Sequence, residues 1–298
     1  MLKISRRRFI YGSASALGFG SAVTSLLACG SSVSPTSQAL PDGVQLVQRF
    51  PQVLVPGEVR LPISLAQQSG IITTDSDFKF PQTLTAKIVD LSNDTVITED
   101  ISVALHGTQI AIPYYPFRTT IEKPGNYMLV VDDGPQDGAA FSVLERDQVL
   151  VPKTGDTMPS FDTPTFDNTR GVNPICTHTP MHCPFHELTL TEALQLKVPV
   201  AYLIGTPAHC STGTCAPALE QLISVASTVG DRAAFVHAEV YSDDAATIVA
   251  PAVKAFAMTF EPALFIVDAN SEIVERLDAV FDVQEITEAL ARAGVATS

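Results

Sequence analysis

Two cysteines in the second half of the chain have the type and spacing to form a redox-active pair. Cys210 and Cys215 follow an apolar run that ends at Gly205, and Ala216-Pro217 after them opens a periodic segment. This pattern predicts a strand, a loop and a helix. The sulfurs would then lie near a helix N-terminus, where unpaired N–H groups and the helix dipole favour a thiolate over a thiol. We therefore expect a dithiol/disulfide couple in which one cysteine is the more acidic.

The four residues between these cysteines constrain where the helix can begin. Five residues along a regular helix separate Cα atoms by about 8.5 Å, whereas a disulfide needs less than about 7 Å. Cys210 must therefore precede the helix, and Gly213 allows the loop to fold back because it can adopt positive φ. Cys210 would be the exposed nucleophile and Cys215 the resolving thiol. The alternative is a structural disulfide that fixes a loop in an oxidising compartment.

A second group of sulfur and imidazole side chains precedes this pair. Cys176 and Cys183 lie in a stretch interrupted by prolines, and we interpret them as a structural disulfide that staples the loop. Three histidines accompany them: His178, His182 and His186. The alternative is a copper or zinc site, because Cys and His sets suit these metals when the thiols are reduced. The prolines forbid a helix here, so coordination would come from a loop.

The elements that must position these groups can be read from apolar periodicity. The predicted strands are 198–205, 233–241, 263–268 and 273–280, and the predicted helices are 218–229 and 282–293. Thr189 and Glu192 have the spacing of a capping box, which predicts a short helix over 190–196. His237 and Glu239 are two residues apart on a predicted strand and would share one face.

These features resemble the thioredoxin superfamily, in particular its envelope-anchored TlpA-like branch. The matching features are the strand that leads into a cysteine pair, the proline two residues after Cys215, Glu261-Pro262 before a strand, and the closing hairpin FIVDANSEIVERLDAVF. GDTMPSF at 155–161 resembles the entry to such domains. The resemblance covers roughly residues 151–293 and implies an α/β thioredoxin-like fold, although the family motif C-x-x-C is replaced here by C-x4-C.

The resemblance also implies roles for individual residues. Pro262 would form a cis peptide bond and face the cysteine pair. His209 occupies a place where the family often has an aromatic residue, and its imidazolium could lower the thiol pKa. Glu239 would be the buried acid that handles protons below the pair. Copper-delivery proteins of the Sco type share the fold and use a C-x-x-x-C pair with a distant histidine, a spacing that neither pair of this chain has.

The N-terminus predicts export and lipid anchoring. SRRRFI at 5–10 resembles a twin-arginine motif, and LLACG at 26–30 resembles a lipoprotein box with Cys29 as the lipidated residue. The alternative is an uncleaved membrane anchor. Residues 1–28 would be the signal peptide and 29–43 a flexible tether rich in Ser and Pro. Either interpretation places the bulk of the protein in the cell envelope, held at a membrane surface outside the cytoplasm.

The segment 44–150 predicts an all-β domain. Seven β-like runs separated by turn signals suggest a sandwich of the immunoglobulin or fibronectin type. The runs are 45–50, 59–65, 83–91, 94–105, 108–112, 126–132 and 139–144. The composition changes near residue 151, so we expect a boundary there and a thioredoxin-like domain over 151–298.

Charge and cysteine count restrict the function. The formal net charge is −14, and removal of the signal, which holds four basic residues and no acidic one, makes it −18, so nucleic-acid binding is excluded. The function we expect is a thiol-disulfide oxidoreductase without a cofactor, acting on protein thiols or disulfides in the envelope. The alternatives are a copper or zinc carrier of the Sco type and a non-catalytic module with two structural disulfides.

Overall fold

The protein was analysed as a computed structural model that describes residues 39–107 and 109–296. The described residues belong to one compact unit. The predicted signal peptide, the predicted lipidation site Cys29 and the first part of the predicted tether lie outside the described residues. Among the residues that are described, none of the helices combines the length and the apolar character needed to cross a membrane.

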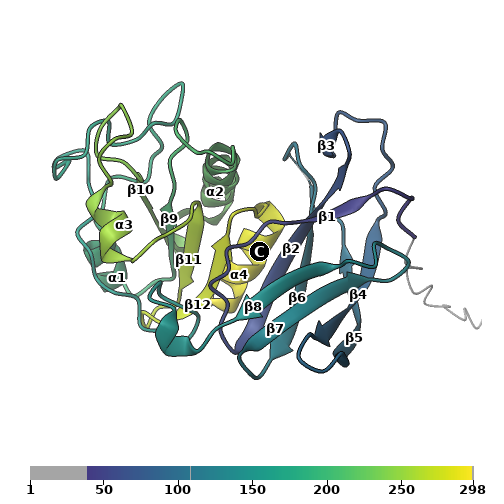
Figure 1. The fold of residues 1–298 in the computed structure, drawn as a ribbon. Coiled ribbons are helices and arrows are strands. Elements are labelled where there is room, and N and C mark those ends of the chain that lie inside the picture. The colour runs from purple at the N-terminus through teal and green to yellow at the C-terminus, as the bar shows by residue number, and fades with distance from the viewer. Residues whose placement is uncertain (1–38, 108, 297–298) are drawn as a thin grey trace, which may run out of the picture. The chain divides into compact units, whose positions relative to one another are not determined.

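The first part of the unit consists of two antiparallel sheets (Figure 1). In the first sheet β2 pairs with three strands, and the members are β1 (Gln45–Gln48), β2 (Gly57–Gln67), β3 (Gly70–Ile71) and β6 (Tyr115–Ile121). The second sheet has the order β5-β4-β7-β8, with β4 (Thr83–Asp90), β5 (Thr95–Ala104), β7 (Gly125–Val131) and β8 (Ala139–Val143). Side chains of both sheets form one buried cluster that includes Leu61, Ile63, Leu84 and Ile88.

One predicted strand of this part is wrong. The run 108–112 is not a strand over its described residues 109–112, and the chain instead forms β6, which pairs with β2. The segment that forms β6 contains Pro116, which made it a poor strand candidate, because proline cannot donate a hydrogen bond to a neighbouring strand. In the structure Pro116 lies opposite Pro62, and within the described residues β6 pairs with β2 alone. In this described part of the chain, no strand on the other edge of β6 therefore requires a backbone N–H from Pro116.

The second part of the unit is a mixed α/β sheet with the strand order β10-β9-β11-β12. β9 (Val200–Ile204) and β10 (Ala234–Ala238) are parallel, and helix α2 (Cys215–Val229) connects them. β11 (Ala263–Val267) runs antiparallel to both β9 and β12 (Ile273–Asp278). The predicted strands and helices of this part are confirmed, and α2 begins three residues earlier than the apolar periodicity indicated.

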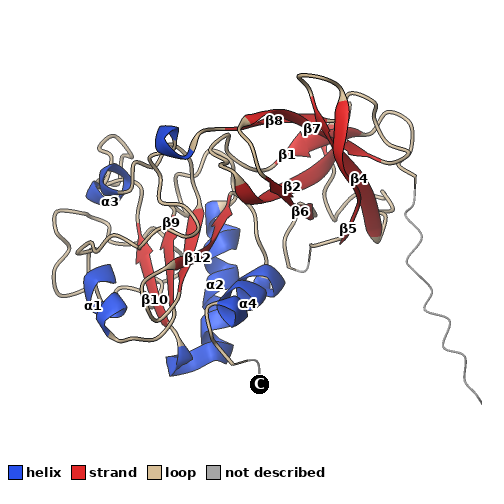
Figure 2. Ribbon diagram, turned by 90° about the horizontal axis from the view of Figure 1, so that it is seen from below, coloured by secondary structure: helices blue, strands red, loops and turns tan. Residues whose placement is uncertain are grey.

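Helices cover both faces of this sheet (Figure 2). The alternate residues Leu203 and Leu264 pack with α2 and α4 (Val283–Arg292), whereas Tyr202 and Phe265 pack on the other face with α1 (Leu190–Gln195) and α3 (Pro251–Ala255). This two-sided burial explains why β9 and β11 are apolar throughout. The capping box predicted for the short helix is confirmed at α1.

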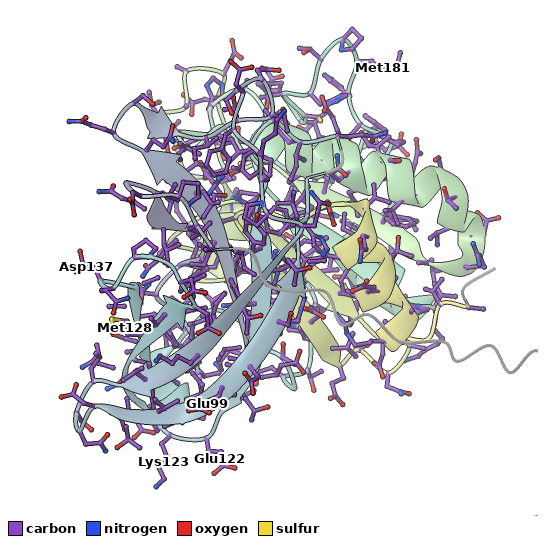
Figure 3. The ribbon with its side chains drawn as sticks, turned by 90° about the vertical axis from the view of Figure 1, so that its right-hand side faces the viewer. Glu99, Glu122, Lys123, Met128, Asp137 and Met181 are labelled. Carbon is purple, nitrogen blue, oxygen red and sulfur yellow. The ribbon has the colours of Figure 1, made fainter. Side chains whose placement is uncertain are left out.

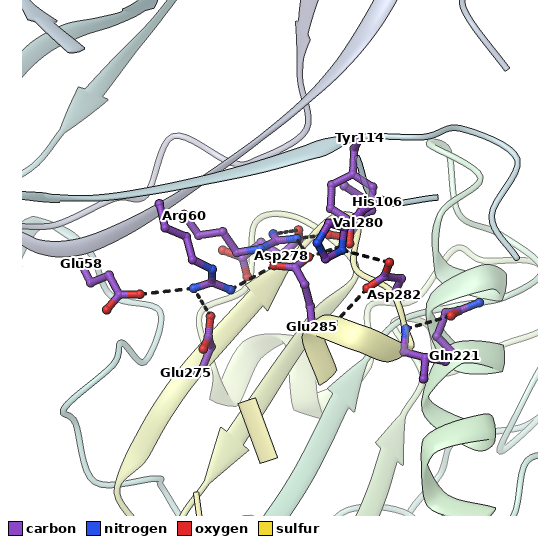
Figure 4. Close-up of polar contacts among 12 residues, drawn as sticks. Glu58, Arg60, His106, Tyr114, Gln221, Glu275, Asp278, Val280, Asp282 and Glu285 are labelled. Carbon is purple, nitrogen blue, oxygen red and sulfur yellow. Dashed lines mark hydrogen bonds and ion pairs between the residues drawn. The ribbon is translucent and has the colours of Figure 1, made fainter. Parts of the chain in front are cut away.

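A buried polar network joins β2 to α4 (Figure 4). Arg60 donates from Nε to Glu285 Oε1 at 2.8 Å and from a second nitrogen to Glu285 Oε2 at 2.5 Å. Tyr114 Oη donates to the same carboxylate at 2.6 Å, and Arg118 lies 3.0 Å from it. Next to it, His106 Nδ1 lies 3.0 Å from Asp282. Because its members come from both parts of the unit, this network holds the antiparallel sheets against the α/β sheet.

Candidate functional site

The loop between β9 and α2 presents the cysteine pair. β9 ends at Ile204, and α2 begins at Cys215. Gly213 adopts φ 66° and donates its N–H to the carbonyl oxygen of Cys210 at 3.1 Å, which folds the loop back. Cys210 is thereby placed before the helix and Cys215 in its first turn, as predicted from the five-residue spacing.

The two thiols of this pair are unequal. Cys215 donates both its backbone N–H and its Sγ–H to Cys210 Sγ, at 3.3 and 2.7 Å. Hydrogen bonds from the Cys215 thiol and from Thr212 lower the pKa of Cys210 to about 4, against the opposing effect of burial. The hydrogen bond to Cys210 and burial raise the pKa of Cys215. Cys210 is half-buried and Cys215 is buried, so the more acidic sulfur is also the more accessible one.

Pro262 lies beside the pair. A Cβ atom placed on Gly205 would be 3.4 Å from Pro262 Cβ and 3.7 Å from Cys215 Sγ, so the end of β9 lies against both residues. The peptide bond between Glu261 and Pro262 is cis, which confirms the detail implied by the resemblance. A carboxylate oxygen of Glu261 lies within 4.8 Å of the sulfurs of both cysteines. Burial, followed by the charge of Cys210, raises the pKa of Glu261 to about 7.

His209 is not among the groups that lower the pKa of Cys210, although its position in the sequence suggested that role. Its ring contacts Tyr241 edge-on with centroids 6.1 Å apart. The groups that lower the pKa of Cys210 are Cys215, Thr212 and the backbone at Thr214. A catalytic role for His209 stays a prediction.

A second cluster, of cysteine and histidine side chains, forms next to the Cys210–Cys215 pair. It is built on the segment 174–187, here called the Cys–His loop, which lies along the outer edge of β10. His237 of β10 donates its backbone N–H to the carbonyl oxygen of Phe185 at 3.1 Å, and the rings of Phe185 and Phe235 stack at 5.5 Å. This edge pairing brings four buried side chains together, with their ligand atoms within 4.8 Å of one another: Cys176, Cys183, His186 and His237. Their exposed fractions are between 0 and 2%.

The cluster centres on His237 Nδ1. This atom lies 3.2 Å from His186 Nε2, 3.4 Å from Cys183 Sγ and 3.8 Å from Cys176 Sγ. The opposite ring nitrogen, Nε2, lies 3.0 Å from the carbonyl oxygen of Gly205. Because a carbonyl only accepts, Nε2 carries a proton, so in the neutral form of the ring Nδ1 offers its lone pair to the cluster.

The other two histidines of the loop do not join this cluster. His178 Nδ1 lies 2.8 Å from the carbonyl oxygen of Met181, and His182 stacks on Phe166 with centroids 6.4 Å apart. The structure therefore assembles only His186 from the predicted ligand set, together with Cys176 and Cys183. Both of these cysteines are free thiols here, and their disulfide stays a prediction.

His237 is the member that sequence reasoning did not assign to a metal site. It is 51 residues from His186, and only the pairing of the Cys–His loop with β10 brings them together. The available signal was a histidine inside an apolar strand, since a buried imidazole requires partners for its nitrogens. Glu239, two residues further, is also buried, and its Oε1 accepts from the backbone N and Oγ1 of Thr177, at 2.6 and 2.8 Å.

The Cys–His loop is tied to the cysteine pair through Thr177. The hydroxyl of Thr177 accepts the N–H of Ala208 at 3.1 Å, two residues before Cys210. At its outer end the loop protrudes, with Met181 72% exposed at the edge of the molecule (Figure 3). The loop thus connects the outer surface, the Cys–His cluster and the segment that carries Cys210.

A scan of family models and a search of curated proteins found no match for this chain.

Proposed function

We propose that the protein is a thiol-disulfide oxidoreductase that uses Cys210 as nucleophile and Cys215 as resolving thiol. The observation that carries the proposal is the direct hydrogen bonding of Cys215 to Cys210 Sγ at the start of α2. Two donors on one sulfur stabilise a thiolate, which is the attacking species in disulfide exchange.

The arrangement around the pair supports the same chemistry. The strand order β10-β9-β11-β12, with the cysteine pair between β9 and α2 and Pro262 before β11, agrees with the thioredoxin-like fold that the sequence resemblance implies. The antiparallel sheets of residues 45–143 agree with an immunoglobulin-like or fibronectin-like sandwich. The function rests on the site rather than on this agreement, because one fold hosts many activities.

The proposed reaction is a two-electron exchange. The Cys210 thiolate attacks one sulfur of a substrate disulfide, forms a mixed disulfide and releases the first substrate thiolate. Cys215 then loses its proton and attacks Cys210 Sγ, which forms the Cys210–Cys215 disulfide and releases the second substrate thiolate. The substrate is reduced by two electrons and the cysteine pair is oxidised. Read in reverse, the same steps oxidise a substrate dithiol.

We assign Glu261 as the group that accepts the proton of Cys215. Its carboxylate lies within 4.8 Å of both sulfurs, and its pKa of about 7 allows it to accept and return a proton near neutral pH. The substrates would be protein thiols or disulfides in the cell envelope, where the N-terminal signal and lipidation motif would place the protein.

Trapping of a mixed disulfide tests the proposal. Cys215→Ala should react with a chromogenic aromatic disulfide and retain one half of it on Cys210, because no thiol remains to resolve the adduct. Cys210→Ala should react slowly, since the remaining sulfur of the pair is 1% exposed. Glu220→Gln on the exposed face of α2 is the matched control and should exchange like the unmodified chain. Equal reactivity of the two single variants would contradict the assigned roles.

The alternative of a Sco-type carrier has one observation in its favour. Cys210, Cys215 and Glu261 form a second set of close ligand atoms. A soft metal such as copper would use both sulfurs of this set. If the reduced protein bound one copper ion tightly and Cys210→Ala did not, the carrier would replace the oxidoreductase.

A further inference from the structure

The cluster behind the redox pair has the composition of a metal centre. Two thiols and two imidazoles converge: Cys176, Cys183, His186 and His237. Two Cys and two His ligands in tetrahedral geometry are typical of structural zinc sites. We propose that these four side chains bind one zinc ion, which fixes the Cys–His loop to the edge of β10.

The distances support tetrahedral coordination. With metal bonds of about 2.0 Å to nitrogen and 2.3 Å to sulfur, a tetrahedron places two nitrogens about 3.3 Å apart and a nitrogen and a sulfur about 3.5 Å apart. The observed separations from His237 Nδ1 are 3.2 Å to His186 Nε2, and 3.4 and 3.8 Å to the sulfurs of Cys183 and Cys176. These three separations lie within about 0.3 Å of the tetrahedral values.

Orientation and burial favour the same assignment. The bond from His237 Nε2 to the carbonyl of Gly205 fixes the tautomer with a free lone pair on Nδ1, the usual role of a backbone carbonyl behind a metal-bound histidine. All four ligands are buried, which excludes water and leaves no open coordination position, as in structural sites. Two thiolates and two neutral imidazoles neutralise Zn²⁺, so the filled site carries no net charge into the interior.

The surface above the cluster provides a route of entry. A hollow reaches Cys176 and is lined by His178, Met181, His182 and His209. Met181 and His182 are exposed, so imidazole and thioether groups are available to an incoming ion before it reaches the buried ligands. The two histidines that the cluster leaves out are therefore placed along the approach to it.

Metal content and spectroscopy of the reduced full-length chain test the proposal. After anaerobic reduction, confirmed by thiol counting, the protein should retain one zinc ion per chain. X-ray absorption at the zinc edge should require two sulfur and two nitrogen neighbours. Substitution with Co²⁺ should give the visible absorption of tetrahedral cobalt and a thiolate charge-transfer band. These measurements use the unsubstituted protein, so they do not depend on whether a variant folds.

Two double variants locate the site. Cys176→Ser with Cys183→Ser should lose stoichiometric cobalt binding, whereas Cys210→Ser with Cys215→Ser should keep one ion with an unchanged spectrum. His182→Gln, which alters the hollow outside the ligand set, should also keep one ion. The proposal is overturned if the reduced chain retains no zinc, if the sulfur count differs from two, if cobalt is lost with Cys210 and Cys215 instead, or if the set binds Cu(I) while refusing zinc.

Discussion

His237 donates from Nε2 to the carbonyl oxygen of Gly205 at 3.0 Å, and this bond links the Cys–His cluster to the strand end beside Cys215. On one side of the bond, His237 Nδ1 is surrounded by the sulfurs of Cys176 and Cys183. On the other, a Cβ atom on Gly205 would lie 3.7 Å from Cys215 Sγ. The backbone at the end of β9 therefore fixes the proposed metal ligand and packs against the proposed resolving thiol.

The pH dependence of Cys210 alkylation should show the ionisation of an acidic thiol. Since hydrogen bonds lower its pKa to about 4, the rate of labelling by iodoacetamide should be nearly constant from pH 8 to pH 6 and should fall only as the pH approaches 4. Cys215→Ala removes the principal donor, so its labelling profile should shift to higher pH. Mass spectrometry of the Cys210 peptide measures both profiles. An unshifted profile would show that Cys215 does not stabilise the thiolate.

Glu261 should control the second step of exchange. Burial and the Cys210 charge together raise the pKa of Glu261 to about 7 in the reduced pair. The mixed disulfide removes the Cys210 charge, so release should rise with pH through an inflection below about 7, as the carboxylate becomes available to accept the Cys215 proton. Glu261→Gln should remove this inflection and slow release by roughly 10²-fold or more, while the first attack by Cys210 changes little. Stopped-flow kinetics separates the two steps. Glu220→Gln on the exposed face of α2 is the matched control, and an equal effect there would reject the assignment.

The buried ion pair between Arg60 and Glu285 should make stability depend on pH. Burial alone would raise the pKa of Glu285, but Arg60 and Arg118 lower it from 4.5 to about 2. A depressed carboxyl pKa contributes stability that is fully present above about pH 4.5 and is lost as the pH falls toward 2. Denaturant titrations at a series of pH values should show this decline.

Substitution of the same residue checks the cause of that dependence. Glu285→Gln leaves Arg60 buried without its partner and should lower the free energy of unfolding by about 3 to 5 kcal/mol, with the decline between pH 4.5 and 2 reduced. Glu288→Gln, one turn further on the exposed face of α4, should cost less than about 0.5 kcal/mol. Similar losses for the two variants would mean that the pair does not contribute as proposed.

Removal of metal should loosen the Cys–His loop. With its four ligands released, the loop keeps the bonds of Thr177 to Glu239 and Ala208 but loses its attachment at Cys176 and Cys183. A chelator should therefore increase proteolytic cleavage near the exposed Met181, and added zinc should restore protection. Cleavage that is the same with and without chelator would show that zinc does not hold the loop.

The sequence was informative where local pattern determines structure. The C-x4-C spacing predicted that Cys210 precedes the helix, and α2 begins after it, at Cys215. The apolar runs that became β9 and β11 were recognisable because helices cover both of their faces. The capping-box spacing of Thr189 and Glu192 predicted α1.

The parts that could not be predicted depend on contacts between distant segments. His237 joins Cys176 only because the Cys–His loop pairs with the edge of β10, and no local pattern encodes that pairing. The regular spacing of His178 and His182 suggested ligands, but the prolines prevent a helix, and both side chains line the hollow instead of joining the cluster. β6 was missed because Pro116 is tolerated only at a sheet edge, which the sequence does not reveal.

The central claim is that the two cysteine pairs have different roles, and a redox titration with glutathione buffers tests it most directly. Alkylation followed by peptide mass analysis reports the state of each pair at each potential. The account predicts that Cys210 and Cys215 convert together at a potential less negative than about −300 mV, while Cys176 and Cys183 stay reduced across the same range, as zinc ligands must. The account is contradicted if the Cys210–Cys215 disulfide resists reduction beyond about −300 mV, the range of structural disulfides, or if Cys176 and Cys183 form the exchanging pair.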